Sequence, residues 1–277
     1  MSRVRGIPET VARKGVVYLV GAGPGDPELL TLRAARLLAT ADVVLHDDLV
    51  PQQLLAMVHP LALLTNVGKR CGRARVTQSE IHALMIDAAR NNLSVVRLKS
   101  GDPLIFGRAG EELQALREAR VEFAVVPGVT AAAAAAASIG LSLTDRRHAS
   151  KLIFASAHYA ASKDQAAPIF AEAPPQDATL LIYMPGRNFS SIAAELARHG
   201  FAVDMPCCCI SHAACPEQQV KATTLQFLST LEPGPAPVIL MIGRALAGAL
   251  EQQQKTGEVS SDTVKEFERE IGFALQQ

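Results

Sequence analysis

VVYLVGAGPGDP, residues 16 to 27, joins a run of β-forming apolar residues directly to a loop rich in glycine and proline. Glycine permits backbone geometry and close ligand approach that a side chain would prevent, and Pro24 stiffens the loop. This pattern predicts a strand that ends in a ligand-contact loop. A dinucleotide-binding fingerprint, G-x-G-x-x-G, would need glycine where this chain has Asp26. On this loop alone, an ordinary structural turn remains an alternative.

The pattern of a β-rich run followed by a helical run repeats through the first half of the chain. Thr77 with Glu80 three residues later forms a capping box that starts one of the predicted helices. Such alternation is typical of a parallel α/β sheet. The predicted strands are residues 16–20, 42–45, 93–98 and 123–126, and predicted helices include 29–39, 111–119 and 131–137.

The second half predicts another α/β domain. Its strand candidates begin at Leu152 and continue at 179–184, 206–211 and 238–242, with a helix at 192–199. We therefore predict an N-terminal extension (1–15), an N-terminal α/β domain (16–148), a C-terminal α/β domain (149–250) and a C-terminal linker with an amphipathic helix (251–277).

Two further loops of unusual composition follow predicted strands. One is KSGDPLIFGR, residues 99–108, and the other is PGVTA, residues 127–131, which supplies a hydroxyl and a helix N-terminus. Ligands of open α/β sheets bind at the carboxyl ends of the strands, so these loops and the first one are expected to converge on one site.

Composition narrows the possible partners. The 277 residues contain 27 Lys plus Arg and 27 Asp plus Glu, so no global charge favours nucleic acid or a membrane surface. We find no apolar run long enough to span a bilayer and no apolar core of a secretory signal, so we expect a cytoplasmic protein.

Five cysteines do not suggest a disulfide framework. Cys207–Cys209 with His212 and Cys215 raise the alternative of a metal site, but neighbouring strand residues point to opposite faces and no C-x-x-C pair is present. We predict reduced thiols and no metal.

Several strings, in order, resemble the tetrapyrrole methylases over roughly residues 16 to 244. They are VYLVGAGPGDPELLTLRAARLL, HDDLV, GKRCG, VVRLKSGDPLIFGRAGEE, VVPGVTAAAAAAASIGLSLTDR, TLLIYMPG and APVILMIG. The pair HDDLV and GKR resembles the branch that methylates uroporphyrinogen III.

The resemblance implies two α/β domains with S-adenosyl-L-methionine in the cleft between them, in a homodimer. It implies methylation of uroporphyrinogen III at C-2 and C-7, which gives precorrin-2 for sirohaem or cobalamin and S-adenosyl-L-homocysteine as second product. The cofactor contacts of the family carry over to Pro24, Ser100, Gly101, Asp102, Ile105, Thr130, Ala131, Met184 and Ala213.

The resemblance also implies an acid/base pair, Asp47 and Lys69. A sulfonium methyl is already electrophilic and a pyrrole carbon already nucleophilic, so alignment and proton transfer remain for the protein. We expect Asp47 to accept a proton, with Asp48 as the alternative, and Lys69 to return one or to hold a substrate acetate. The substrate carries eight carboxylates, so a protein without net charge must gather cations locally, and arginine suits carboxylates. Arg108 lies inside a motif and is expected to bind substrate, whereas Lys99 and the other cations are each interpreted as solvated surface charges.

Three alternatives stay open. Ser100 stands where the family has the first glycine of its GGDP loop, which keeps open a catalytically silent relative that only binds the cofactor. A sister methylase could act on a later precorrin or cobalt-precorrin, although HDDLV and GKR argue against it. A nucleotide-binding oxidoreductase is disfavoured by Asp26.

Overall fold

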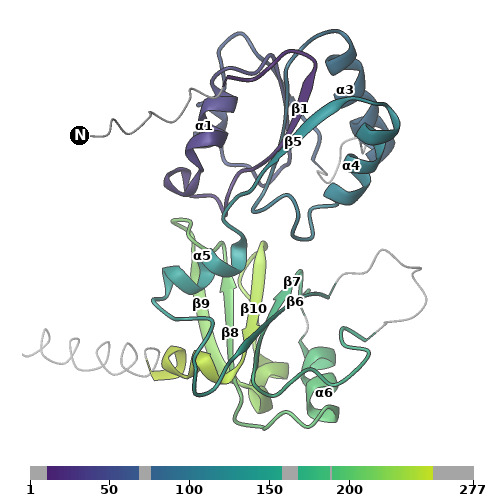
Figure 1. Cartoon of the computed structure of the whole chain (residues 1–277). Helices are drawn as coiled ribbons and strands as arrows, with labels where there is room; N and C mark the ends of the chain where they lie inside the picture. The colour runs from purple at the N-terminus through teal and green to yellow at the C-terminus, as the bar shows by residue number, and fades with distance from the viewer. Residues whose placement is uncertain (1–10, 69–75, 158–167, 188, 252–277) are drawn as a thin grey trace, which may run out of the picture. The chain divides into compact units, whose positions relative to one another are not determined.

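The computed structural model describes residues 11–68, 76–157, 168–187 and 189–251. The chain divides into two units, residues 1–134 and 135–277. Each unit contains a five-stranded sheet of its own (Figure 1). The two α/β domains predicted from the sequence are confirmed.

The first unit is built on a parallel sheet in the order β3-β2-β4-β1-β5. Tyr18 of the interior strand β1 lies opposite Val96 of β4 on one side and Ala124 of β5 on the other. The strands are β1 (Val16–Gly21), β2 (Val43–His46), β3 (Leu63–Asn66), β4 (Val95–Lys99) and β5 (Glu122–Val126). The helical segments are η1 (Pro27–Leu29), α1 (Leu32–Leu38), α2 (Gln52–Leu55), α3 (Gln78–Arg90) and α4 (Ala109–Glu118).

Helices cover both faces of this sheet, α1 on one side and α3 with α4 on the other (Figure 1). Successive strand side chains alternate between faces, so Tyr18 and Val20 pack with the α1 cluster whereas Val17 and Leu19 pack with the other cluster. Both faces are buried, which explains why the strands read as continuous apolar runs.

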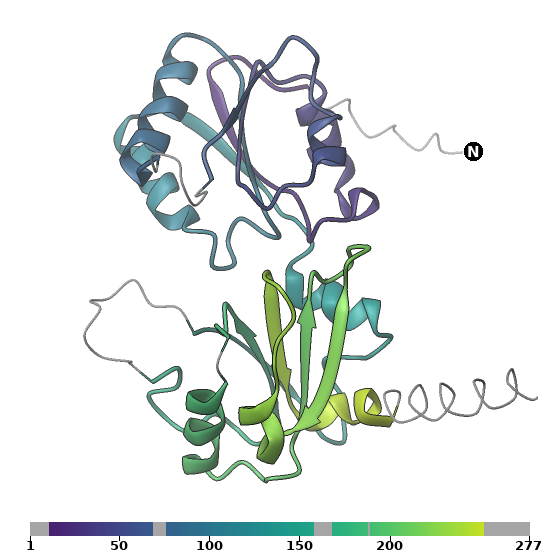
Figure 2. The ribbon, with the colours of Figure 1, turned by 180° about the vertical axis from the view of Figure 1, so that it is seen from behind.

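The second unit holds a mixed sheet in the order β6-β7-β10-β8-β9. β6 and β7 are parallel, while β10 runs antiparallel to β7 and β8, and β9 antiparallel to β8. Its strands β8, β9 and β10 lie side by side in Figure 2. The elements are β6 (Lys151–Ser156), β7 (Ala178–Tyr183), α6 (Ser190–Arg198), β8 (Pro206–Ser211), β9 (Gln219–Thr224), η2 (Leu225–Thr230), β10 (Val238–Ile242) and η3 (Arg244–Leu246).

Several predicted elements have the expected positions, and others differ. The capping box of Thr77 and Glu80 is present at the start of α3, and the strands predicted at 206–211 and 238–242 are confirmed as β8 and β10. The helix predicted at 29–39 was wrong in extent, because Thr31 caps a new helix after the η1 turn. β3 and β9 were not predicted.

The division between the units falls inside α5 (Ala131–Ser138), whereas the sequence suggested a boundary at 148/149. Both positions lie between β5 and β6, so they assign the strands identically. The predicted linker and helix at 251–277 lie outside the described residues, apart from residue 251.

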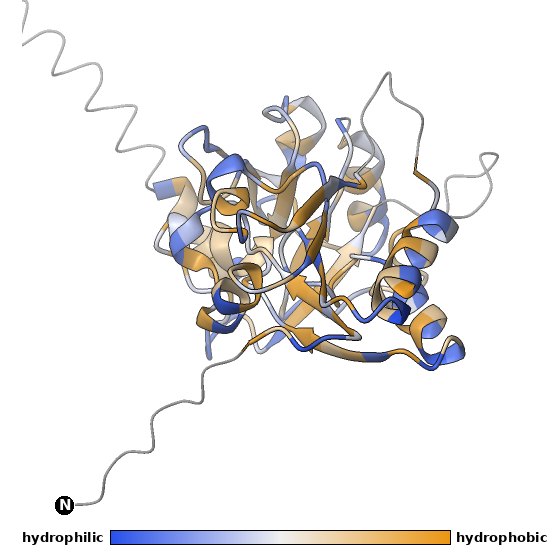
Figure 3. Ribbon diagram, turned by 90° about the horizontal axis from the view of Figure 1, so that it is seen from above, coloured by the Kyte–Doolittle hydropathy of each residue, from blue (hydrophilic) through white to orange (hydrophobic). Residues whose placement is uncertain are grey.

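The strands are mainly hydrophobic, whereas the helices carry both hydrophobic and hydrophilic residues (Figure 3). Within the described ranges, no helix combines the length and hydropathy needed to cross a membrane.

Candidate functional site

The loops that follow β1, β4 and β5 are joined by hydrogen bonds at the carboxyl edge of the first sheet. Gly23 N donates to Gly101 O at 3.1 Å, and Gly101 N donates to Gly23 O at 2.7 Å. Gly128 N donates to Asp102 Oδ2 at 3.0 Å. The convergence of the three loops, predicted from their positions after strands, is therefore present within this unit.

Glycine is required where these loops touch. A Cβ on Gly128 would lie 2.3 Å from the carbonyl oxygen of Gly101, a distance that real Cβ atoms essentially never show. Gly101 itself has φ of +66°, in the left-handed region that disfavours other residues. The glycines at these two positions therefore set how closely the loops approach.

Asp102 organises this edge through its side chain. Its Oδ1 accepts from Leu104 N at 2.8 Å while its Oδ2 accepts from Gly128 N. The carboxylate predicted to contact the cofactor thus joins the β4 and β5 loops.

The Ser100 hydroxyl stands out for its surroundings. Its φ is not positive, so serine in place of the family's glycine brings no left-handed strain at this position. Its Oγ is buried and has no hydrogen-bond partner within the part of the chain that the structure describes. Because an unpaired buried hydroxyl is costly, this atom fits a ligand acceptor or donor that completes the site.

Asp47 and Asp48 follow β2 at the same edge and have different surroundings. Asp47 Oδ1 accepts from Arg97 Nη2 at 2.5 Å, and the Asp47 side chain is 30% exposed. Asp48 Oδ1 accepts from Asn66 Nδ2 at 2.8 Å, which connects the ends of β2 and β3. Lys69, the predicted partner of Asp47, lies outside the described residues.

A buried ion-pair network lies behind Asp47. Arg97 Nε donates to Glu112 Oε1 at 3.0 Å, and Lys99 Nζ lies 2.9 Å from Glu112 Oε2. Burial lowers the pKa of Lys99, and the positive charge of Arg97 lowers it further. Lys99 is 3% exposed, so the favoured interpretation of this residue as a solvated surface charge was wrong.

Arg97 and Glu112 were not predicted from the sequence. The sequence does contain a pattern that could have indicated them. Arg97 and Lys99 are two cationic residues, two positions apart, in an otherwise apolar strand. That spacing places both side chains on one face, where a buried carboxylate is required.

The remaining predicted residues of the first unit also lie in strand-end loops. Arg108 precedes α4 and forms a two-bond ion pair with Glu111, with Nη2 to Oε2 at 2.6 Å. Ile105 lies in the turn that Asp102 closes. Thr130 and Ala131 stand at the start of α5, and Pro24 lies between the two glycines of the β1 loop.

The second unit carries Met184 and Ala213, which follow β7 and β8. Met184 has φ of 49° and is 47% exposed. Ala213 lies between His212 at φ 50° and Ala214 at φ 59°. Left-handed conformations are unfavourable for residues with a Cβ and are concentrated at ligand-binding sites.

Backbone strain therefore coincides with the predicted loops in both units. Of the seven described non-glycine residues with positive φ, two follow the C-caps of α3 and α4, where this conformation is ordinary. The other five, in loops predicted to bind the cofactor or substrate, are Phe106, Arg108, Met184, His212 and Ala214.

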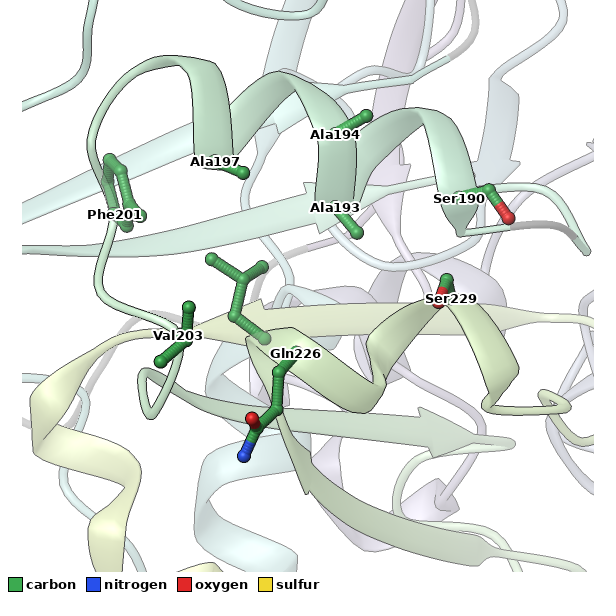
Figure 4. A pocket seen from close by; sticks show the side chains of 9 residues that line it. Ser190, Ala193, Ala194, Ala197, Phe201, Val203, Gln226 and Ser229 are labelled. Atoms are coloured by element: carbon green, nitrogen blue, oxygen red, sulfur yellow. The ribbon is translucent and has the colours of Figure 1, made fainter.

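Two other features carry no predicted role. A shallow pocket between α6 and η2 contains none of the predicted site residues (Figure 4). Cys207, Cys208 and Cys209 are free and buried on β8. In the described ranges, no group of three or more His, Cys, Asp or Glu is placed to hold a metal ion.

A family model for the tetrapyrrole (corrin/porphyrin) methylases matches residues 16–229. This chain belongs to that family. The methylase is 43% identical, over 86% of its own length and 84% of the relative's, to a uroporphyrinogen-III C-methyltransferase of Paracoccus denitrificans. It is also 45% identical to siroheme synthase 1 of Klebsiella pneumoniae. That match covers 84% of this chain but only 49% of the siroheme synthase.

Among solved structures, the methylase resembles a uroporphyrin-III C-methyltransferase of Thermus thermophilus, solved in complex with S-adenosylhomocysteine. The TM-score is 0.70 at 36% identity, covering 83% of this chain and 93% of the other. This likeness supports the two-sheet architecture described above.

Proposed function

We propose that this methylase transfers methyl groups from S-adenosyl-L-methionine to C-2 and C-7 of uroporphyrinogen III, giving precorrin-2. The observation that carries the proposal is the 43% identity to the Paracoccus enzyme across most of both chains. The same likeness disfavours a later precorrin or cobalt-precorrin as substrate.

S-adenosyl-L-methionine supplies the electrophilic methyl group of this reaction. The buried, unpaired Ser100 hydroxyl and the strained backbone around Met184 and Ala213 support binding by the predicted residues. The proposed contacts are Pro24, Ser100, Gly101, Asp102, Ile105, Thr130, Ala131, Met184 and Ala213.

Asp47 is the proposed base. Methylation at carbon makes the pyrrole cationic, and loss of a proton to a carboxylate restores neutrality. The Asp47 carboxylate is partly exposed and Arg97 fixes its orientation, which supports this role. The choice of Asp47 over Asp48 rests on the family resemblance. Lys69 is proposed to return a proton or hold an acetate, and Arg108 to bind a substrate carboxylate.

The test is anaerobic incubation of the purified protein with uroporphyrinogen III and methyl-labelled S-adenosyl-L-methionine, followed by mass analysis of the tetrapyrrole. We expect a gain of two methyl groups. Transfer only to a later precorrin would favour the sister activity, and tight cofactor binding without transfer to any tetrapyrrole would favour a silent relative.

We also propose that the protein is a cytoplasmic homodimer. Leucines exposed at the edge strand β3 and just before it support an oligomer, since Leu61 is 89% and Leu63 is 64% exposed.

A further inference from the structure

Glu112 is the centre of the buried charge network in the first unit. It is fully buried on α4 and lies between Arg97 and Lys99, which point to the same face of β4. Gln78 Nε2 also donates to Glu112 Oε1 at 3.3 Å. Together with Asp47 the network contains two carboxylates and two cations, so its formal charge is balanced.

Stability is a weak reason for such a network. Each buried ion carries a desolvation cost of several kcal/mol, and well-packed apolar residues of similar volume are often as stable as a buried ion pair. The network is not closed within the core, however. Its outer end is Asp47, whose side chain is 30% exposed at the carboxyl edge of the first sheet.

Arg97 connects Glu112 with Asp47 and is bonded through all three of its nitrogens. Nε donates to Glu112, and Nη1 donates to the carbonyl oxygens of Leu45 at 3.4 Å and Leu98 at 3.2 Å. Nη2 is then directed at Asp47 Oδ1. Since a guanidinium is planar and rigid, fixing two of its nitrogens fixes where the third points.

We propose that Glu112 and Arg97 are positioning residues: Glu112 orients Arg97, and Arg97 orients the Asp47 carboxylate for proton removal. This inference rests on the proposed function, in which Asp47 is the base. Both side chains are buried, so each acts through the partly exposed Asp47.

The test is a double-mutant cycle on kcat for methyl transfer to uroporphyrinogen III, with Arg97→Gln, Asp47→Asn and the double variant. Arg97→Gln leaves the Lys99–Glu112 pair intact and charge-balanced, so we expect the variant to fold. We expect it to lower kcat by roughly 10- to 100-fold, the size of effect that a small misplacement of a reacting group produces. In the Asp47→Asn background it should lower kcat no further, because residues that act as a unit are not additive.

Two measurements separate positioning from general damage. The Kd of S-adenosyl-L-methionine, measured by calorimetry, and the thermal midpoint should stay close to wild type in Arg97→Gln. Glu112→Gln should lower kcat in the wild-type background, as Arg97→Gln does. In the Asp47→Asn background it should cause no further loss. If Glu112→Gln does not fold, the double-mutant cycle of Arg97→Gln and Asp47→Asn tests the inference by itself.

Glu195→Gln is the matched control for a buried carboxylate. Glu195 is 6% exposed in the second unit and accepts from the backbone nitrogens of Ile169 and Phe170. Any loss of kcat that Glu195→Gln causes should be the same in the wild-type and the Asp47→Asn backgrounds.

Equal losses from Arg97→Gln in both backgrounds, or an unchanged kcat, would overturn the inference. Absence of methyl transfer by the wild type would instead refute the proposed function, and the inference would fall with it. An active wild type with a fully active Asp47→Asn would refute the assignment of the base.

Discussion

At the scale of single residues, the loops at the carboxyl edge of the first sheet depend on a close backbone contact and on one side-chain hydrogen bond. Gly128 packs against the Gly101 carbonyl, and Asp102 reaches across to the Gly128 nitrogen. These contacts hold the three loops in one arrangement. Preorganisation of this kind reduces the ordering cost of binding.

Gly128→Ala tests this packing. The added Cβ would meet backbone atoms that cannot rotate away, so we expect a loss of stability of about 1–3 kcal/mol and weaker binding of S-adenosyl-L-methionine. Gly110→Ala is the control, because nothing lies within 4 Å of its Cβ position and alanine favours helix. Urea unfolding and calorimetry give both quantities, and equal behaviour of the two variants would contradict the prediction.

Asp47→Asn and Asp48→Asn form a pair of neighbouring carboxylate variants. Asp47→Asn should lower kcat by about 100-fold or more, the contribution typical of a general base, with little change in cofactor affinity. Asp48→Asn keeps an oxygen that can accept from Asn66 and should keep most of the activity. The assignment is wrong if the larger loss follows Asp48→Asn.

At the scale of secondary-structure elements, hydrogen bonds between Asp42 and Ser94 join β2 and β4, because each residue immediately precedes its strand. Asp42 Oδ2 accepts from Ser94 N at 2.7 Å and from Ser94 Oγ at 2.6 Å, and Asp42 Oδ1 lies 2.5 Å from Lys14 Nζ. Burial alone would raise the pKa of Asp42, but the bonds from Lys14 and Ser94 outweigh it and lower the pKa to about 2.

Asp42→Asn should therefore reduce stability in a pH-dependent way. A carboxyl whose pKa is lowered by folding contributes stability above its unfolded pKa, and this contribution disappears as pH falls toward the folded value. We expect a loss of about 1–2 kcal/mol at pH 7, after discounting for solvent screening, and almost none near pH 2. Urea unfolding across this range measures it, with exposed Asp87→Asn as a control that should show no such trend.

The strand β8 holds three consecutive cysteines on alternating faces, with Cys207 and Cys209 in the α6 cluster. Burial raises the pKa of Cys207 and of Cys208 to about 12. The thiolate is the reactive species, so these thiols should be inert in the folded protein.

Alkylation at pH 8 followed by peptide mass mapping tests this expectation. Cys215, which is half-buried, should react first among the described cysteines, and the β8 thiols should react only after denaturant unfolds the second sheet. Rapid native labelling of Cys208 would show that β8 opens more readily than its burial indicates.

At the scale of the whole molecule, the two units use different sheets. The first is entirely parallel and covered by helices on both faces, whereas the second combines one parallel pair with antiparallel strands. Among exposed apolar residues, Leu61, Leu63 and Leu64 are close in sequence, and the last two belong to the edge strand β3.

Light scattering tests the proposed homodimer, for which the mass should be twice the 29.4 kDa of one chain. Since exposed apolar residues on an edge strand favour association, Leu61→Lys with Leu63→Lys should shift the protein toward monomer if this edge is the interface. Val203→Lys, at another exposed apolar position, is the control. A monomeric wild type would refute the dimer.

The sequence by itself determined the fold class, the three strand-end loops and the family, because these depend on local patterns. Apolar runs, a capping box and glycine-rich turns are written in contiguous residues, as the agreement of β1, β8 and β10 with their predicted positions shows. β3 and β9 escaped prediction because they are edge strands with much exposed surface, which weakens the apolar signal.

Only the tertiary structure decided how Arg97, Glu112 and Asp47 meet. They are separated by up to 65 positions in the chain, and no local pattern relates a charge on β4 to a carboxylate on α4 or after β2. The pairing follows from strand order and from the face of the sheet that α4 covers. Burial then removes water as an alternative partner, so these charges must pair with one another.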